Sequence, residues 1–150
     1  KISRFVDDRL TVIVLTNLGD AGFAGTIARG IAKIYIPAIS IKAMMPVADA
    51  DAKLTEKFFN ALRERLENKF DAGFLTENLT KSLSTNRAKA NNARIASFGA
   101  VKNFTPVGAE TGENSKIYRY RAETAKRLFL WRFTVNTEGK LTEMTLEDEE

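Results

Sequence analysis

The stretch KIYRYRAETAKRLFLWRFTVNTEGKLTEMTL, residues 116–146, decides the fold class, because its apolar side chains recur at alternate positions. A period of two is typical of β-strands, whose successive side chains point to opposite faces of a sheet. The stretch holds three such runs, and the last two are joined by a tight turn that contains Gly139. Strands joined by short turns pair antiparallel, so this stretch predicts an antiparallel meander.

Alternation places aromatic side chains on one face of the predicted meander. This face carries Tyr118, Tyr120, Phe129, Trp131 and Phe133. Aromatic residues at period two on a sheet face covered by helices favour a packed core. The alternative is a cone-shaped ligand pocket between a long helix and a curved sheet, for which the candidate lining residues are Tyr118, Tyr120, Trp131 and Phe133.

Upstream of the meander the apolar period is close to four. Leu54, Phe58, Leu62, Leu66 and Phe70 recur at this spacing, which predicts one long amphipathic helix. Shorter helices are expected over 74–83 and 87–97. A further strand is expected over 101–109, and Pro106 indicates that it is an edge strand or carries a bulge. Helices followed by a meander predict an α+β fold, with helices packed on a curved antiparallel sheet of about four strands.

A different pattern opens the chain, in the stretch LTVIVLTNLGDAGFAGTIARGIAKIYIP at residues 10–37. A short strand over 2–6 and an apolar strand over 10–16 precede a glycine-containing loop and a helix over 23–35. The second strand is apolar on both faces, so we expect it inside a sheet. Gly19, Gly22 and Gly25 lack the spacing of a dinucleotide-binding loop, and we interpret them as a tight turn.

The change of pattern predicts two parts. The first is a hairpin-and-helix part over 1–37, and the second is an α+β domain over 52–150. The segment 38–51 between them contains Pro46 and small residues, which is typical of a linker.

Composition excludes several kinds of chemistry. The 150 residues include neither Cys nor His, so thiol nucleophiles, disulfides and imidazole-based triads or zinc sites cannot form. No apolar run approaches the roughly 20 residues of a membrane span. The acidic pairs Asp7–Asp8 and Asp49/Asp51 fall at turn or linker positions, and we interpret them as solvated turns. The sequence predicts no cofactor and no metal site.

The chain has a net charge of +4, and its excess of basic over acidic residues is unevenly distributed. Residues 86–132 hold ten Lys or Arg against three acids, and the C-terminal residues turn acidic. A basic surface can bind nucleic acid, but no nucleic-acid-binding motif is present. We therefore interpret these residues as solvated strand faces, some of them paired with the acidic last strand.

The stretch SRFVDDRLTVIVLTNLGDAGFAGTIARGIAKIYIP, residues 3–37, resembles the end of the catalytic domain of serine β-lactamase and penicillin-binding-protein-like hydrolases. In that family a closing strand is followed by a loop and a C-terminal helix that packs on the sheet. Residues from about 50 onward resemble the cystatin-like or nuclear-transport-factor-2-like domain appended to some of these hydrolases. The strands GAVKNF (99–104) and YRYR (118–121) and the turn GKL (139–141) carry this second resemblance.

The family's catalytic motifs are S-x-x-K, Y-x-N and K-T-G. None is present: no serine is followed at the third position by Lys, no tyrosine at the second by Asn, and Thr111-Gly112 follows Glu110 rather than Lys. The resemblance therefore implies a non-catalytic C-terminal region with a structural, ligand-binding or wall-binding role, in a longer polypeptide whose upstream domain is a serine hydrolase. It also implies a periplasmic, extracellular or cell-envelope location. The alternative function is a self-standing small-ligand-binding domain or small enzyme with a conical pocket.

One physical consequence concerns partners. A strand that is apolar on both faces has to be covered, so we expect Leu10–Leu15 to pack on the second part or to pair with another chain by strand pairing or exchange. No nucleic-acid partner is expected.

Overall fold

A computed structural model describes residues 1–17, 21–71 and 73–150, and the chain divides into two compact units. The N-terminal unit is Lys1–Met44 and the C-terminal unit is Met45–Glu150. This boundary falls within the segment 38–51 that the sequence indicates as a linker. Each unit has a hydrophobic cluster of its own.

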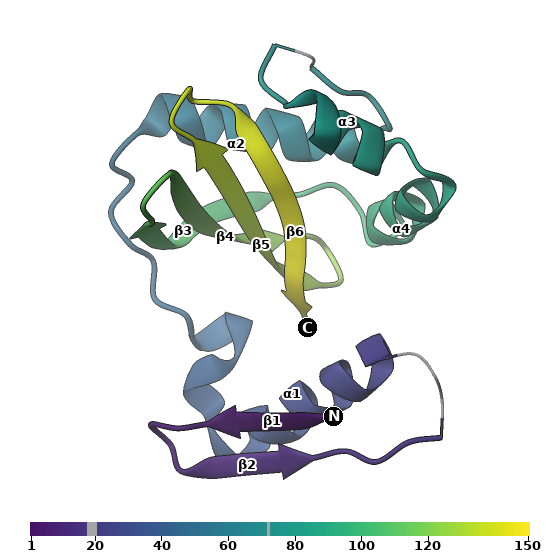
Figure 1. Cartoon of the computed structure of the whole chain (residues 1–150), viewed down its shortest axis with the longest axis vertical. Coiled ribbons are helices and arrows are strands. Elements are labelled where there is room, and N and C mark those ends of the chain that lie inside the picture. The colour runs from purple at the N-terminus through teal and green to yellow at the C-terminus, as the bar shows by residue number, and fades with distance from the viewer. Residues whose placement is uncertain (18–20, 72) are drawn as a thin grey trace. The chain divides into compact units, whose positions relative to one another are not determined.

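The N-terminal unit is a β-hairpin followed by helices (Figure 1). Its elements are β1 (Ile2–Phe5), β2 (Leu10–Ile13), α1 (Ala21–Tyr35) and the 3-10 turns η1 (Pro37–Ile39) and η2 (Ile41–Ala43). The two strands pair antiparallel, and the turn between them has Arg9 in the left-handed region at φ 52°. Pro37 follows the end of α1, as predicted, because proline has no amide hydrogen to continue a helix.

The second strand is covered on one face only, which corrects the expectation of a strand inside a sheet. Val12 and Val14 are buried in a cluster with the alanines of α1, whereas Ile13 is 61% and Leu15 is 90% exposed. Two strands and one helix can bury only one side of a hairpin. Within this unit, the side chains of the second strand are therefore alternately buried and exposed.

The glycines of the opening stretch also differ from their predicted role. Helix α1 begins at Ala21, so Gly22 and Gly25 belong to the helix and not to a turn. Gly19 lies outside the described residues.

Three helices open the C-terminal unit, and each begins at a residue whose side chain caps it. They are α2 (Ala52–Leu66), α3 (Glu77–Leu83) and α4 (Asn86–Ala96). Asp51, Thr76 and Thr85 each accept a hydrogen bond from the backbone amide three residues ahead, which satisfies one of the amides that a helix start leaves open.

The predicted helix over 74–83 begins later than its apolar pattern suggests. Leu75 forms a parallel bridge with Leu141, and the amide of Thr76 donates to the carbonyl of Leu141 at 3.0 Å. Phe74 therefore lies in a turn, Leu75 pairs with Leu141, and Thr76 has an extended backbone and caps α3. Similarly, α2 ends at Leu66, and Asn68 follows it in the left-handed region at φ 57°, so Phe70 lies beyond the helix.

Four antiparallel strands follow in the order β3-β4-β5-β6, which confirms the predicted meander (Figure 1). They are β3 (Asn103–Thr111), β4 (Ser115–Glu123), β5 (Leu128–Asn136) and β6 (Leu141–Glu149). The register shifts between Pro106 and Gly108, so the proline lies on an edge strand and beside a bulge, as predicted. Gly139 adopts φ 76° in the tight turn before β6.

The core of the C-terminal unit lies between the helices and one face of this sheet. Phe58 of α2 stacks on Phe133 of β5, with 4.7 Å between ring centroids. Leu79 and Leu83 of α3 and Ile95 of α4 belong to the same cluster. The predicted α+β architecture is therefore confirmed.

Candidate functional site

The four aromatic residues predicted as pocket candidates lie in or against the hydrophobic core. Tyr120, Trp131 and Phe133 are buried, and Tyr118 packs against them while keeping part of its surface exposed. Phe104 of β3 stacks on Tyr120 with 4.4 Å between centroids, which fills the space beside that ring. A ligand role for these four residues stays a prediction.

Tyr118 also lines a surface pocket of about 470 Å³ at one end of the sheet. Lys57 of α2, Lys116 of β4 and the turn residue Thr137 contribute to the same pocket. The pocket combines lysine side chains with the edge of an aromatic ring, and of the four predicted residues only Tyr118 reaches it.

A chain of hydrogen bonds joins the core to the start of α2. The Thr55 hydroxyl donates to Asp49 at 2.9 Å, and it lies 2.7 Å from the Tyr120 hydroxyl. Because the Thr55 proton is directed to Asp49, we assign Tyr120 as the donor to Thr55. Burial is the main cause that raises the pKa of Tyr120, and the phenol stays protonated at neutral pH. Asp51 thus caps α2, and Asp49 accepts from the Thr55 hydroxyl and the Asp51 amide.

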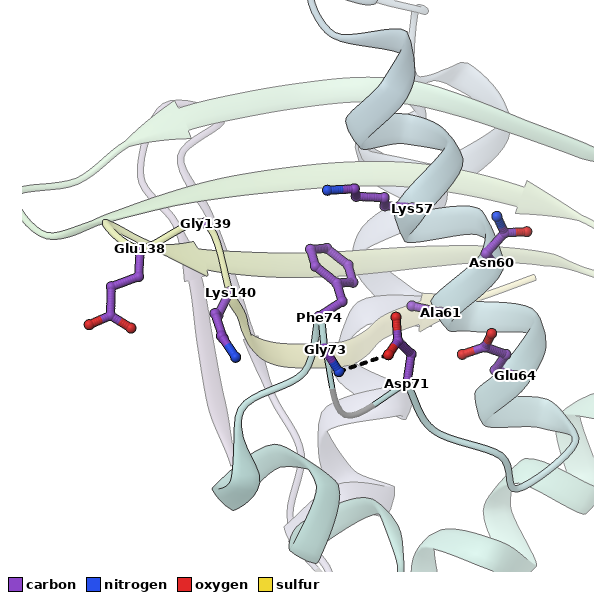
Figure 2. A pocket seen from close by; sticks show the side chains of 10 residues that line it. All are labelled: Lys57, Asn60, Ala61, Glu64, Asp71, Gly73, Phe74, Glu138, Gly139 and Lys140. Atoms are coloured by element: carbon purple, nitrogen blue, oxygen red, sulfur yellow. Dashed lines mark hydrogen bonds between the residues drawn. The ribbon is translucent and has the colours of Figure 1, made fainter.

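A second pocket, of about 430 Å³, lies between α2 and the turn before β6 (Figure 2). Figure 2 shows the Phe74 ring between Lys57 and Asp71, with Lys140 on the opposite wall. The Lys57 ammonium lies 5.7 Å from the centroid of the Phe74 ring, and Asp71 accepts a hydrogen bond from the Gly73 amide at 2.7 Å. The residues that line this pocket carry charges of both signs, from Lys57 and Lys140 and from Glu64, Asp71 and Glu138.

Arg65 of α2 is the most unusual polar residue of the unit, because only 6% of its surface is exposed. Its guanidinium stacks on Trp131, with Cζ 4.9 Å from the ring centroid. Nε donates to Asn92 at 3.1 Å, and Nη1 donates to the carbonyl of Met144. Asn92 is itself fully buried and donates to Asn68 at 3.1 Å.

The Arg65 charge has no carboxylate partner among the described residues. Burial lowers the pKa of Arg65 to about 10, so the guanidinium is still charged at neutral pH. A buried charge is costly unless hydrogen bonds and an opposite charge compensate it. Here the cation–π contact and two hydrogen bonds supply only part of that compensation.

Arg65 lines a third pocket, of about 650 Å³, formed by α3, α4 and β6. Polar side chains of this pocket include Asn78, Ser82, Arg87 and Asn91. Leu79, Leu83 and Leu146 supply an apolar wall. The pocket therefore brings a largely buried cation together with polar and apolar side chains.

Sequence reasoning missed this site, although one signal for it exists. Arg65 follows Phe58 by seven positions and Leu62 by three, which places a charged residue on the apolar face of α2. A charge on that face requires a buried partner or a ligand.

The basic residues of the outer sheet face are paired with acids, as the sequence analysis proposed. Arg119 bonds to Glu110 and to Glu147, while Arg132 bonds to Glu143 and lies 3.7 Å from Glu147. These ion pairs place Arg119 and Arg132 beside acidic residues of β6.

In the described ranges, no group of three or more acidic side chains could hold a metal ion, and no helix has the length and apolarity to cross a membrane. Comparison of the chain with protein-family models, curated proteins and solved structures finds no match.

Proposed function

We propose that the chain is a non-catalytic accessory region of a serine hydrolase of the β-lactamase and penicillin-binding-protein-like class, and that its C-terminal unit binds a small ligand. The proposed partner is a catalytic domain upstream in the same polypeptide. The proposed location is the cell envelope, the periplasm or the extracellular space.

The outer face of the hairpin carries this proposal. Ile2 and Ile13 are opposite each other across the two strands, and both are more than half exposed on the face away from α1. A sheet face of this kind is apolar where another layer covers it. The next pair on this face is Arg4 with Thr11, so its apolar part is the Ile2–Ile13 end. A helix on one face and exposed isoleucines on the other are what the last strands of a larger, two-sided sheet would present.

The absence of S-x-x-K, Y-x-N and K-T-G supports a non-catalytic role for this region. The reaction of the proposed hydrolase needs a serine activated by a neighbouring lysine. These 150 residues contain no such serine–lysine pair, so the nucleophile would have to come from the proposed upstream domain.

A serine-reactive fluorescent penicillin tests the proposal. The 150-residue chain is expected to remain unlabelled, whereas the longer polypeptide that contains it is expected to be labelled upstream of Lys1. Labelling of the chain itself, or a longer polypeptide without a reactive serine, would contradict the proposal. A phenyl-fluorophosphonate probe in parallel covers a hydrolase that does not accept penicillins.

The second candidate is a self-standing ligand-binding module of the nuclear-transport-factor-2-like kind. The independent core of the C-terminal unit favours it, since this unit holds its own buried cluster and its own pockets. Under this alternative no serine hydrolase accompanies the chain, and the labelling experiment on the longer polypeptide gives no signal.

A further inference from the structure

We propose that the pocket around Arg65 binds a small organic anion, with a carboxylate or phosphate head at Arg65 and an apolar body against α3 and β6. This inference gives a ligand class to the ligand-binding role proposed above, and to that extent rests on it.

The first argument is the uncompensated charge of Arg65. Its Nε and Nη1 atoms donate to Asn92 and Met144, and Nη2 has no hydrogen-bond partner among the described residues. Only 6% of the Arg65 surface is exposed, yet the residue lines a pocket that opens to solvent, and Nη2 is not among the fully buried atoms that lack a partner. An anion in this pocket would supply both the missing acceptor and the missing counter-charge.

The second argument is the electrostatic character of the pocket wall. The wall includes the first turn of α4, where Thr85 accepts a hydrogen bond from the Ala88 amide at 3.2 Å. A helix N-terminus carries partial positive charge, and Arg87 adds a full positive charge from the same turn. Arg87 forms no ion pair with a described residue.

The acid in the pocket does not neutralise these cations. Glu143 lines the wall, but its carboxylate accepts hydrogen bonds from Arg132, Thr134 and Thr145 on the sheet. Its charge is therefore shared with Arg132, and Arg65 and Arg87 remain available to a ligand.

The third argument is the apolar part of the wall. Leu146 is partly exposed on one side of the pocket, whereas Leu79 and Leu83 on the other side are only 6% and 4% exposed, and the volume of about 650 Å³ lies within the usual range for small-molecule sites. An inorganic ion would leave this wall unused. An anion with a short alkyl or aromatic body would also cover the part of Leu146 that is exposed.

The chain contains one tryptophan, and it is the ring on which Arg65 stacks. Its fluorescence therefore reports directly on the guanidinium. We would titrate the chain at pH 7 and constant ionic strength with hexanoate, hexyl phosphate, hexan-1-ol and inorganic phosphate. Hexanoate or hexyl phosphate is expected to change the Trp131 emission in a saturable manner. Hexan-1-ol is expected to bind at least about tenfold more weakly, because it lacks the charge-assisted hydrogen bonds.

Three variants locate the site. Arg65→Gln is expected to abolish saturable binding. Arg87→Gln, on the exposed first turn of α4, is expected to weaken it about threefold, as the loss of an exposed charge contact would. Lys89→Gln removes the same charge from the same helix outside the pocket, and should leave the affinity unchanged.

Equal affinities for hexanoate and hexan-1-ol would overturn the proposal, as would equal effects of the Arg87 and Lys89 substitutions. These outcomes remain decisive if Arg65→Gln does not fold, since they need only the unchanged chain and two surface variants. If inorganic phosphate saturates the site with the same affinity as hexyl phosphate, the proposal that the ligand has an apolar body is contradicted. If the chain does not bind these anions, the accessory role still depends on the penicillin labelling, because that experiment does not involve Arg65.

Discussion

At the scale of single residues, Asn92 determines how Arg65 is held. Asn92 has no exposed surface, accepts from Arg65 Nε and donates to Asn68. Asn92→Ala would leave a buried guanidinium nitrogen without an acceptor, so we expect it to lower the free energy of unfolding by about 2–3 kcal/mol. Urea denaturation followed by Trp131 fluorescence measures the change.

The matched control for Asn92 is its neighbour Asn91, which is partly exposed and accepts only from the exposed Arg94. Asn91→Ala is expected to change the free energy of unfolding by less than about 0.5 kcal/mol. Equal losses in the two variants would show that the Arg65–Asn92 contact contributes no particular stability.

Glu143 gives a prediction for the pH dependence of stability. Burial would raise the pKa of Glu143, but hydrogen bonds from Arg132, Thr145 and Thr134 outweigh burial, and the pKa is lowered from its ordinary value of 4.5. A carboxyl with a lowered pKa in the folded state contributes stability above its ordinary pKa, and loses it as the pH falls through the folded value. Stability from Glu143 is therefore full at neutral pH and declines below about pH 4.5.

Thermal unfolding of Glu143→Gln beside the unchanged chain checks this pH dependence. The difference in melting temperature is expected to be largest near pH 7 and to shrink towards pH 3. A difference that is constant with pH would mean that the charge of Glu143 does not stabilise the fold. Thr142→Ala, also on β6, is a control without a titrating group.

Residue patterns predicted the sheet faces well and the buried cation poorly. Alternation placed Arg119 and Arg132 opposite the aromatic residues because side chains in a strand change face at every step. The role of Arg65 depends instead on the carbonyl of Met144 and the amide of Asn92. Those groups are far away in the sequence, and no local periodicity brings them together.

At the scale of elements, a side chain can be added at the glycines of α1, whereas the glycine of the last turn has a backbone conformation that side chains disfavour. A Cβ added at Gly25 or Gly30 would meet nothing within 4 Å, whereas Gly139 adopts φ 76°. Gly30→Ala is expected to stabilise the N-terminal unit by about 0.5–1 kcal/mol, because alanine loses less backbone entropy in a helix. Gly139→Ala is expected to destabilise the C-terminal unit by about 1 kcal/mol through its left-handed backbone.

Circular dichroism during thermal unfolding of the two single variants measures both effects. Gly25→Ala is the second helical test, and should act in the same direction as Gly30→Ala. Destabilisation by both helical substitutions would indicate that these glycines contact something beyond the N-terminal unit.

Periodicity predicted the long elements well and set the start of the short helix α3 too early. The period of four marked α2, and the period of two marked β4 and β5, because each of these elements buries one continuous face. The start of α3 is set by Thr76 and by the pairing of Leu75 with Leu141, which is a tertiary contact. The exposed face of β2 was missed since apolar residues alone do not reveal whether a second layer is present.

At the scale of the whole molecule, the hairpin of the N-terminal unit is a surface for association. Both of its strands are edge strands, and Ile13 and Leu15 are exposed. When no upstream domain covers this face, we expect the chain to self-associate through Leu10–Leu15. Sedimentation velocity over a range of concentrations is expected to show a reversible dimer or larger species.

A charge within the exposed face tests this association. Ile13→Lys is expected to shift the chain towards the monomer, because it places a charge in the surface that would be buried. Lys42→Glu is a control that changes charge in the same unit outside the hairpin. A monomer at all concentrations for the unchanged chain would contradict strand-mediated association.

The order of the strands in the C-terminal unit bears on how fast it folds. Within the sheet each strand pairs with its neighbour in the chain, whereas the contacts of Leu141 with residues 74–76 and of Arg65 with Met144 span long segments. Closing short loops costs little conformational entropy, so the pairing of neighbouring strands can precede the long-range contacts. The meander can thus act as a folding nucleus, with the docking of residues 74–76 onto β6 completing the transition afterwards.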